Sequence, residues 1–577
     1  MVVPCPNLDT ALFLYTTSVK FESRADDHDK GRNAHRGRSP VVSVTRELPR
    51  FGRPGSRSAE LHTGPLGEAS SSETAPSMRE RNRFEALRVI GLTGTFLIAL
   101  GGLGGGALPV VDASATSFAS LPLGAWMGRM MLASSSLALV GVAFLVFAWL
   151  LMGAFVGAGG GPSRVAAPTL LRTLGAWILP LIFTAPLFTQ DIYSYLAQGA
   201  IVARGLDPYS AGPVELLGHE DPLARSVPFI WAESPSPYGP VALGISSVIS
   251  RLTGTSIFWG VICHRLIALI GLAAAAWAIV TLARRCGVNR SAAVWLGALN
   301  PLVVLHLVGG IHNEAVMMGF LLVGLELGLR GIDRLGGATG WGLLVASGIL
   351  ISCAGMVKVT GFLALGFVGM ALARRWGGLL GIAGAIAVQT TVMVVSIAAA
   401  TALTGIGLGW VSGQGGAATI RSWLSLTTDV GVISAFIGQL LGLGDHSEAA
   451  LVVTRTCGLL IAAGFILRML WATYKGTIHP VGGLGVSTLV LVLLFPVVHP
   501  WYPLWGIMPL AAWADRAFFR AGTAAYCALF SFVVLPRGLA LPPAAVATIY
   551  VNALLAVVAI AACAWAWFRI HGQKVLH

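Results

Sequence analysis

The sequence predicts an all-α polytopic membrane protein, and three observations support that fold class. Hydrophobic residues make up 55% of the chain and charged residues only 11%, whereas an average soluble domain is about 25% charged. Runs of about twenty apolar residues recur from Leu87 to the C-terminus, each long enough to cross a hydrocarbon core. Lys and Arg lie mostly in the short connections between these runs, as the positive-inside rule requires. The formal charge of +13 therefore reflects membrane topology, and nucleic acid is not an expected partner.

The first 86 residues differ in composition from the rest of the chain. They are rich in Arg, Ser, Gly and mixed charge, and they lack the periodicity of a buried face. We expect residues 1–86 to form a disordered cytoplasmic tail. They hold no apolar core of the signal-peptide type before Met78, and a translation start at Met78 is an alternative interpretation. Residues 87–570 form the predicted membrane domain, and residues 571–577 a cytoplasmic C-terminus.

Basic residues assign each connection to one side of the membrane. Arg79, Arg81 and Arg83 place the N-terminus in the cytoplasm, and Arg284 with Arg285 marks a later inner connection. Alternation between the two sides predicts a bundle of about 13–15 transmembrane helices. The predicted spans are residues 87–108, 130–156, 168–188, 257–282, 295–308, 316–329, 341–356, 359–373, 378–403, 452–466, 481–498, 504–513, 523–535 and 546–568.

One apolar segment does not fit this alternation. Residues 239–251 are barely long enough to span, and counting them as a crossing would put Arg284 and Arg285 on the outer side. We therefore expect a re-entrant or interfacial helix that is buried against protein, because irregular backbone survives at that depth only when protein covers it. Residues 427–443 are a second candidate for such an element.

The segment 189–238 leaves the membrane on the outer side, and it begins with an acidic residue. Asp191 directly follows the predicted span 168–188, among tyrosines and amides, in a chain that is poor in acidic residues. We interpret Asp191 as the catalytic base, and Tyr193, Tyr195 and Gln198 as substrate-binding neighbours. The more distant acids of this segment are read as solubilising: Glu215, Glu220 and Asp221.

A second acid of this segment has two open interpretations. Asp207 lies in a turn-forming string with Tyr209, so a ligand contact and an Asx turn are both possible. We keep Asp207 and Tyr209 as candidate substrate-binding residues.

Further polar clusters lie at the outer ends of predicted spans. His312, Asn313 and Glu314 begin one span, where they could bind substrate or simply cap the helix and offset its dipole. Lys358 stands between two apolar runs that reach the outer face. It could bind a substrate phosphate or extend toward lipid phosphate.

Two more clusters contain aromatic residues. Arg421 and Trp423 lie in an outer glycine-rich loop, and His499, Trp501 and Tyr502 follow a predicted span. Trp and Tyr at this depth are often interfacial anchors, but indole faces beside polar groups also suit carbohydrate rings. We expect all five residues to bind substrate.

Two classes of site are not indicated. The cysteines are scattered and mostly lie inside apolar runs, so they form neither a disulfide nor a zinc framework. The chain has no P-loop, and an outward-facing enzyme cannot readily use cytosolic nucleotide sugars. A polyprenyl phosphate is therefore the expected sugar carrier, and no metal is obligatory because that carrier is a good leaving group.

Five short motifs carry a family resemblance. They are residues 190–199 (QDIYSYLAQG), 205–209 (GLDPY), 310–314 (GIHNE), 423–425 (WLS) and 499–502 (HPWY). Together they resemble the actinobacterial polyprenol-phosphomannose-dependent α-1,6-mannosyltransferases of lipomannan and lipoarabinomannan synthesis, which belong to the GT-C superfamily. The resemblance covers about residues 88–568. Glu314 stands where many relatives carry Asp.

The resemblance implies a GT-C-like bundle with a large first extracytoplasmic loop, residues 189–238, that carries the essential aspartate at Asp191. It implies a plasma-membrane enzyme that transfers mannose, with inversion, from a polyprenyl-phosphate donor to the 6-hydroxyl of a lipid-linked mannan acceptor. Lys358, Arg421 and His499 would stabilise the departing phosphate. A GT-C enzyme for another sugar remains open. A lipid-linked sugar flippase is the other alternative, and it would favour polar groups near the midplane and internal repeats.

Overall fold

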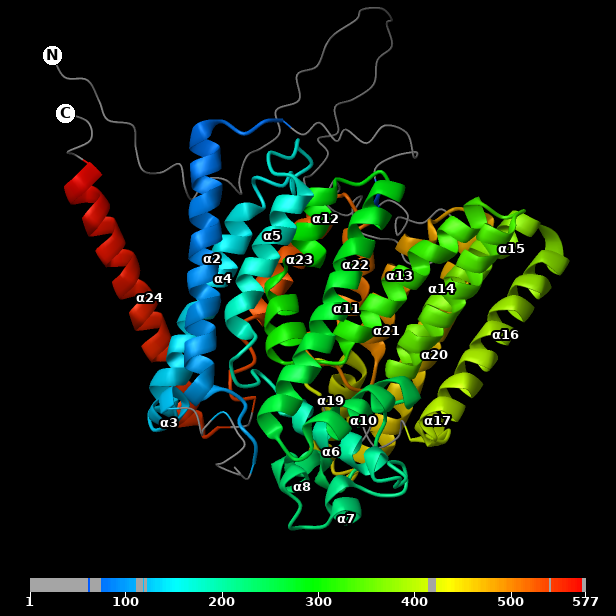
Figure 1. The fold of residues 1–577 in the computed structure, drawn as a ribbon, viewed down its shortest axis with the longest axis horizontal. Coiled ribbons are helices and arrows are strands. Elements are labelled where there is room, and N and C mark those ends of the chain that lie inside the picture. The colour runs from blue at the N-terminus through cyan, green and yellow to red at the C-terminus, as the bar shows by residue number, and fades with distance from the viewer. Residues whose placement is uncertain are drawn as a thin grey trace, which may run out of the picture. The chain divides into compact units, whose positions relative to one another are not determined.

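The computed structural model describes residues 61–62, 74–110, 118, 122–413, 422–538 and 541–572. The chain divides into two units, residues 1–48 and 49–577, and every described residue belongs to the second. The described residues form helices and connections without a β-strand, which confirms the all-α prediction (Figure 1).

The helices of the described residues are, in chain order, α2 (Met78–Gly105), α3 (Pro122–Gly128), α4 (Met131–Met152), α5 (Ala167–Ile178), η4 (Leu179–Leu181), α6 (Asp191–Ala203), α7 (Pro213–Leu217), α8 (Pro222–Ser226), α9 (Phe229–Ala232), α10 (Pro240–Thr253), α11 (Ile257–Arg285), α12 (Arg290–Gly297), η5 (Val303–Gly309), α13 (Glu314–Asp333), α14 (Ala338–Val357), η6 (Val359–Phe362), α15 (Leu363–Trp376), α16 (Gly378–Thr404), α17 (Gly409–Ser412), α19 (Leu426–Leu440), α20 (Ser447–Lys475), α21 (Pro480–Leu494), α22 (Leu504–Ala511), α23 (Ala517–Phe530) and α24 (Pro543–Gly572).

Eight helices of the described chain are long and apolar enough to cross a membrane: α2, α4, α11, α13, α14, α16, α20 and α24. Helices α10, α19, α21 and α23 are apolar but shorter. Other predicted spans consist of two short pieces, because Pro180 and Pro301 lack the N–H that would continue the helix. The chain is therefore polytopic, and the expected 13–15 crossings stay a prediction.

The N-terminal boundary of the membrane domain differs from the prediction. Helix α2 begins at Met78 rather than near residue 87, because the Ser77 and Glu80 side chains and backbone N–H groups form a capping box. Leu61 is buried in the core, and its carbonyl accepts from the backbone N–H of Asp515. The expected disorder of residues 1–86 is thus wrong for Leu61 and for residues 78–86. Most of the predicted tail lies outside the described residues.

Small residues bring α2 and α4 together over most of their length. A Cβ on Gly101 would lie 2.5 Å from the carbonyl oxygen of Ser134, and one on Gly105 would lie 2.5 Å from the backbone nitrogen of Ser135. Only glycine permits such an approach, which is the usual means of close helix packing in membranes.

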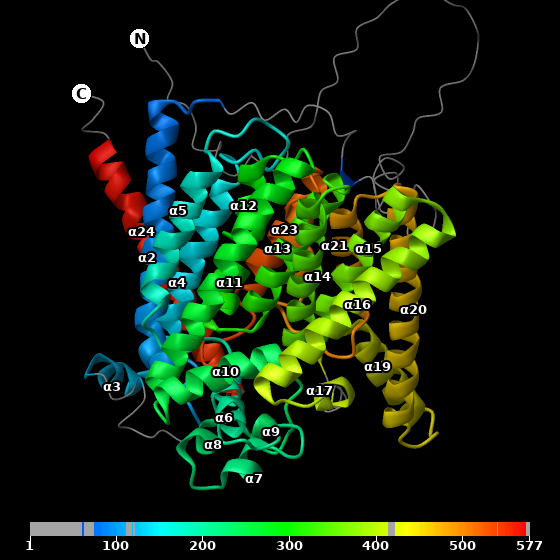
Figure 2. The same ribbon diagram turned by 45° about the vertical axis from the view of Figure 1, so that its right-hand side comes forward.

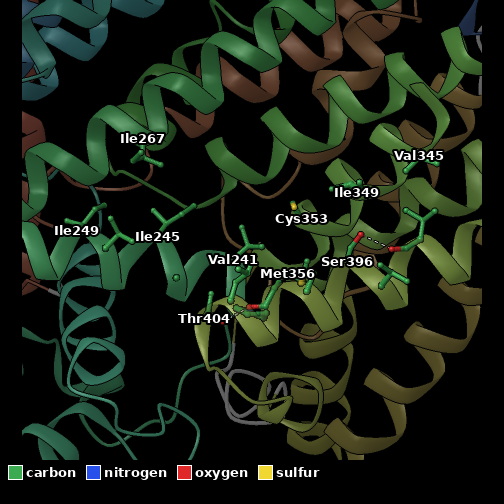
Figure 3. A pocket seen from close by; sticks show the side chains of 18 of the residues that line it. Val241, Ile245, Ile249, Ile267, Val345, Ile349, Cys353, Met356, Ser396 and Thr404 are labelled. Carbon is green, nitrogen blue, oxygen red and sulfur yellow. Dashed lines mark hydrogen bonds between the residues drawn. The ribbon is translucent and has the colours of Figure 1, made fainter. Parts of the chain in front are cut away.

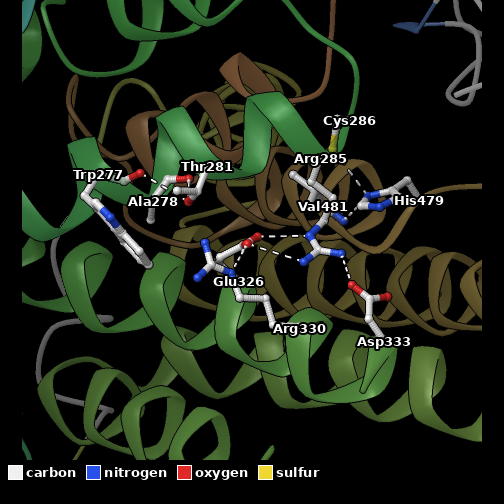
Figure 4. A network of polar contacts seen from close by, with 10 residues as sticks. All are labelled: Trp277, Ala278, Thr281, Arg285, Cys286, Glu326, Arg330, Asp333, His479 and Val481. Carbon is white, nitrogen blue, oxygen red and sulfur yellow. Dashed lines mark hydrogen bonds and ion pairs between the residues drawn. The ribbon is translucent and has the colours of Figure 1, made fainter. Parts of the chain in front are cut away.

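The two ends of the bundle differ in charge. Helices α11, α13, α15 and α20 carry Arg or Lys in their last turns, all at one end. At that end Arg285 forms ion pairs with Glu326 (3.0 Å) and Asp333 (2.6 Å), and Arg330 also pairs with Glu326 (Figure 4). The network ties α11 to α13. Figure 1 shows α6, α7 and α8 at the opposite end, and Figure 2 shows α9 beside them.

The segment expected as a polar outer loop is largely helical. Apolar residues at helical spacing bury α6 against α10, so Asp191 begins a buried helix rather than a solvated loop. Helix α10, the expected re-entrant element, packs on α6, α11, α14 and α16. Figure 2 shows it crossing the lower end of the bundle above α6. These two helices form the floor on which the candidate site is built.

Candidate active site

A cavity of about 140 Å³ lies where α6, α13 and the segments after α14 and α21 meet. Its walls combine acidic, basic and aromatic side chains from parts of the chain that are far apart in sequence. The lining residues are Asp191, Tyr195, Trp231, Pro237, Tyr238, His312, Glu314, Lys358, Val359, Thr360, Phe495, Pro496, Val497, His499, Trp501, Tyr502 and Trp505. Eight of the predicted site residues are therefore together around one cavity.

Asp191 is the acidic group of this cavity that stays open to it. Its Oδ1 accepts a hydrogen bond from the indole Nε1 of Trp231 (3.1 Å), and its Oδ2 lies 3.6 Å from Nδ1 of His312. The side chain retains 26% of its exposure, whereas that of His312 retains 1%. Trp231 thus holds one carboxylate oxygen, the other lies beside His312, and the group can still reach a ligand.

Two strained backbone positions precede the Asp191–His312 pair. Phe188 has a φ of 68°, and Ile311, directly before His312, has a φ of 56°. Bulky and β-branched residues rarely adopt this left-handed conformation, and such strain gathers at functional sites. The two segments that precede these positions are joined by a hydrogen bond from the Leu187 N–H to the Gly309 carbonyl (3.0 Å). The chain turns sharply just after this bond in both segments, at Phe188 and at Ile311.

The fully buried guanidinium of Arg265 joins the same two segments. From α11 it donates to the carbonyls of Ile182 and Thr184 at 2.7 Å, and more weakly to that of Ala185. Its Nε donates to the Val308 carbonyl at 3.3 Å. Arg265 thus holds both the segment that leads to Asp191 and the segment that leads to His312. All four of these hydrogen bonds go to backbone carbonyls and none to a carboxylate.

Glu314 and Lys358 form a buried ion pair on the wall of the cavity. Lys358 Nζ donates to Glu314 Oε1 at 2.8 Å and lies 4.2 Å from the centre of the Tyr502 ring and 4.6 Å from that of Trp505. Lys358 is the C-cap residue that follows α14, and it lines the cavity, so its ammonium extends inward instead of toward lipid phosphate. The pair keeps a positive group at the cavity in spite of burial.

Three histidines surround the indole of Trp501. Its ring centroid lies 4.1 Å from that of His312, and 4.7 Å from those of His499 and His306. In the connections that carry them, burial lowers the pKa of His312 and lowers that of His499 to about 4. Both rings are therefore neutral near pH 7. The faces of Trp501 are occupied by imidazoles, so a sugar could meet only its edge.

Other predicted site residues lie away from the cavity. The hydroxyl of Tyr193 donates to the Ala107 carbonyl (2.7 Å) and fixes the start of α6. Gln198 accepts from the Ser236 hydroxyl (3.1 Å), and Tyr209 donates to the Tyr238 carbonyl (2.9 Å). These side chains shape the floor beneath the cavity instead of lining it.

The remaining predicted residues have diverse positions. Asp207 accepts from the backbone N–H of Tyr209 (3.0 Å), which is the Asx-turn alternative. Asn313 occupies the N-cap of α13 without a side-chain capping bond and borders a small neighbouring pocket with His312. Trp423 is largely exposed and does not line the cavity, and Arg421 lies outside the described residues.

Sequence reasoning missed four residues: Trp231, Tyr238, Trp505 and Arg265. Trp231 and Tyr238 lie in the outer segment that carries Asp191, and aromatic residues in a segment outside the membrane would have been the signal for them. Trp505 follows the motif 499–502, which includes His499, by three residues. Arg265 lies in the middle of an apolar run. A charged residue is costly to bury there, so it is a candidate functional residue from the sequence alone.

The chemistry that this arrangement permits follows from its charges. The cavity presents an accessible carboxylate, a positive group and neutral imidazoles in a setting with many aromatic rings. A carboxylate can accept a proton from a bound hydroxyl, while Lys358 can stabilise an anionic leaving group. Among the described residues no group of three or more His, Cys, Asp or Glu side chains could hold a metal ion.

Comparisons with known proteins identify a family and several relatives that this chain resembles. Residues 88–374 match the family described as α-(1→6)-mannopyranosyltransferase, N-terminal domain, and residues 427–562 match the MptB C-terminal domain. The chain is 54% identical to α-(1→6)-mannopyranosyltransferase B of Corynebacterium glutamicum, over 89% of this chain and 90% of the relative.

Two proteins of Mycobacterium tuberculosis are also similar. An α-(1→6)-mannopyranosyltransferase is 41% identical over 75% of this chain and 79% of its own length. An α-(1→6)-mannopyranosyltransferase A is 33% identical over 77% of this chain and 83% of its own length. No solved structure matches this chain.

Proposed function

The chain belongs to the α-(1→6)-mannopyranosyltransferase family, and from this membership we propose that it takes mannose from a polyprenyl-phosphate donor and adds it to the 6-hydroxyl of a lipid-linked mannan acceptor. The protein is a glycosyltransferase. Donor, acceptor, stereochemistry and membrane side are the parts that we infer. The observation that carries the proposal is the open carboxylate of Asp191 in the same cavity as the Lys358 ammonium.

The transfer proceeds as a single displacement. The acceptor 6-hydroxyl oxygen attacks the anomeric carbon of a β-mannosyl phosphate, and Asp191 accepts the hydroxyl proton. The bond from the anomeric carbon to the phosphate oxygen breaks, and its electron pair leaves with the polyprenyl phosphate. Attack from the face opposite the leaving group inverts the anomeric centre and gives the α-linkage.

Each neighbouring group has a defined part in this reaction. Trp231 and His312 orient the Asp191 carboxylate. Lys358 shares its charge between Glu314 and the departing phosphate, which gains negative charge in the transition state. The neutral imidazole of His499 donates a hydrogen bond to a phosphate oxygen, and Arg421 remains a further candidate for this role. Trp505 Nε1 and His312 Nε2 are buried without a partner among the described residues and are suited to sugar oxygens.

The distribution of charge supports our inference that the active site lies on the outer side of the plasma membrane. The basic ends of α11, α13, α15 and α20 lie at the opposite end of the bundle from α6–α9, and basic residues favour the cytoplasm. Such a site receives its sugar on a lipid carrier, because nucleotide sugars stay in the cytosol.

The test is product analysis with membranes that contain the protein. Labelled polyprenyl-phosphate mannose, glucose and arabinose are supplied separately with a mannan acceptor. The proposal expects label in an α-(1→6)-linked product from the mannose donor, lost in D191N. Equal incorporation from glucose or arabinose would overturn the donor assignment, and undiminished transfer by D191N would overturn the assignment of the base.

A further inference from the structure

Several walls of the active-site cavity begin or continue a helix. Asp191 begins α6, Glu314 begins α13 and Lys358 follows α14. Figure 3 shows Met356 near the end of α14 and Val241 of α10, where both border a separate apolar cavity of about 890 Å³. These walls are therefore held by the packing of whole helices.

The wall segment, residues 495–499, is built differently. It is an irregular connection between α21 and α22, and Phe495, Pro496, Val497 and His499 all line the cavity. Its backbone carbonyls have no place in a regular helix, and a carbonyl that is buried without a partner is costly. The position of this wall must therefore come from contacts with other parts of the chain.

Two buried hydroxyl groups at the start of α19 bind the first carbonyls of the wall segment. Ser425 donates to the Phe495 carbonyl at 2.7 Å, and Thr428 donates to the Pro496 carbonyl at 2.8 Å. Neither Ser425 nor Thr428 lines the cavity. Both side chains thus support the wall from outside the space that a substrate would fill.

A third buried hydroxyl binds the wall segment directly before His499. Ser422 donates to the Val498 carbonyl, and it accepts from the backbone N–H of Val498 at 3.1 Å. The Val498 carbonyl is part of the peptide bond that leads into His499. Ser422 therefore fixes the backbone that carries the His499 imidazole.

Neighbouring donors direct these hydroxyl hydrogens toward the wall. The Thr428 hydroxyl accepts from Arg455 Nε at 3.1 Å, and the Ser425 hydroxyl accepts from the Thr428 N–H at 3.2 Å. A guanidinium and a backbone N–H can only donate, so each hydroxyl hydrogen is left for a carbonyl.

Helix capping alone does not explain the three side chains. Ser425 is the N-cap of α19, but that role uses only its capacity to accept from the Thr428 N–H. Ser422 precedes the helix, and Thr428 lies inside its first turn. What the three residues share is a hydrogen bond to the wall segment.

We propose that Ser422, Ser425 and Thr428 are positioning residues for mannosyl transfer, because they hold the wall segment and so fix the His499 imidazole beside the departing phosphate. The inference rests on the proposed function, in which His499 donates to that phosphate. It also gives the motif 423–425 a different part from the one expected: Ser425 supports the wall, whereas Trp423 is largely exposed.

A double-substitution experiment tests the inference. S422A and T428V each remove one hydroxyl, and each is made in the wild-type chain and in H499Q. The measurement is kcat/KM for transfer from polyprenyl-phosphate mannose to a mannan acceptor by the full chain in membranes. If one variant does not reach the membrane, the other carries the same expectation.

The inference expects S422A and T428V to lower kcat/KM about tenfold in the wild-type background, because a small displacement of a reacting group has a large effect on rate. In the H499Q background the same substitutions should change it less than about twofold, because they act through a side chain that is already lost. T428S keeps the hydroxyl and should restore most of the activity.

T454V is the matched control. Thr454 lies on α20 beside α19, but its hydroxyl donates only to the Ala450 and Leu451 carbonyls of its own helix. T454V should leave kcat/KM unchanged in both backgrounds.

Three results would overturn the inference. They are wild-type rates in both S422A and T428V, losses of equal size in the wild-type and H499Q backgrounds, and a wild-type rate in H499Q itself. Each of them leaves mannosyl transfer by the wild-type chain intact. If the wild-type chain transfers no mannose from this donor, the proposed function fails and the inference falls with it.

Discussion

Asp191 Oδ2 lies 3.6 Å from His312 Nδ1, although one residue begins α6 and the other precedes α13. Each stands shortly after a non-glycine residue with left-handed backbone, Phe188 or Ile311. These strained conformations persist only because the surrounding contacts hold both segments in place. The relative position of the two side chains is therefore set by the folded backbone before any substrate binds, and the contacts that set it can be tested.

We expect Arg265 to affect turnover by holding Asp191 in position. R265K keeps a positive charge but loses the fork that donates to the Ile182, Thr184 and Val308 carbonyls. A displacement of about 1 Å at Asp191 should lower kcat about tenfold to a hundredfold with little change in KM. Steady-state kinetics measures the split between the two parameters.

R520K provides the control for this change. Arg520 is also a buried arginine and donates to the Gly157 carbonyl, but it does not contact the segments that carry Asp191 or His312. Both variants should lose thermal stability, and only R265K should lose kcat. Equal kinetic effects of R265K and R520K would reduce Arg265 to a structural role.

The Glu314–Lys358 pair separates stability from function. K358M leaves the Glu314 carboxylate buried without its partner and should lower the free energy of unfolding by about 3 kcal/mol or more. The double variant K358M/E314L removes both charges and should recover most of that stability while transfer stays low. Thermal unfolding in detergent and a transfer assay measure the two effects. A double variant with restored activity would show that the ammonium has no part in the reaction.

The histidines of the cavity should not set the pH dependence of transfer. Burial lowers the pKa of His499 to about 4, so its ring stays neutral between about pH 5 and 8. Burial also lowers the pKa of His312 below its usual value. H499Q should therefore change the size of kcat/KM without changing the shape of its pH profile in this range. A wild-type limb near pH 6.5 that disappears in H499Q would contradict this expectation.

Side-specific labelling tests the membrane orientation. Single cysteines replace Ser210, exposed near α6, and Arg334, exposed after α13, in a chain without its native cysteines. A membrane-impermeant maleimide should label S210C in intact cells, and R334C only after lysis. Label on R334C in intact cells would reverse the proposed sidedness.

Much of the fold followed from local signals in the sequence. The apolar runs place the long helices, and charge in the connections separates the basic end from the end with α6–α9. The start of α2 was missed because a capping box extends a helix into a polar sequence. Helix α6 was missed because its apolar spacing is short and interrupted by tyrosines and a glutamine.

The site was predictable only in part. Asp191, His312, Lys358 and His499 were singled out because each is an isolated polar residue at the end of an apolar run, and the structure places all four around one cavity. Tyr193, Gln198 and Tyr209 have the same local signal but bond to neighbouring backbone or to Ser236. Tertiary packing decides which polar side chains face the cavity, and the local sequence pattern does not reveal this orientation. Their roles stay predictions.

The most direct test of the central claim is single-turnover mannosyl transfer from polyprenyl-phosphate mannose by D191N, with E220Q as the control. Glu220 lies in the same outer segment with 93% of its side chain exposed. Removing a general base should slow D191N at least about a hundredfold, with unchanged expression and thermal unfolding, while E220Q keeps the wild-type rate. Transfer by D191N at the wild-type rate would contradict the account, because the cavity would then contain no group in the role assigned to Asp191.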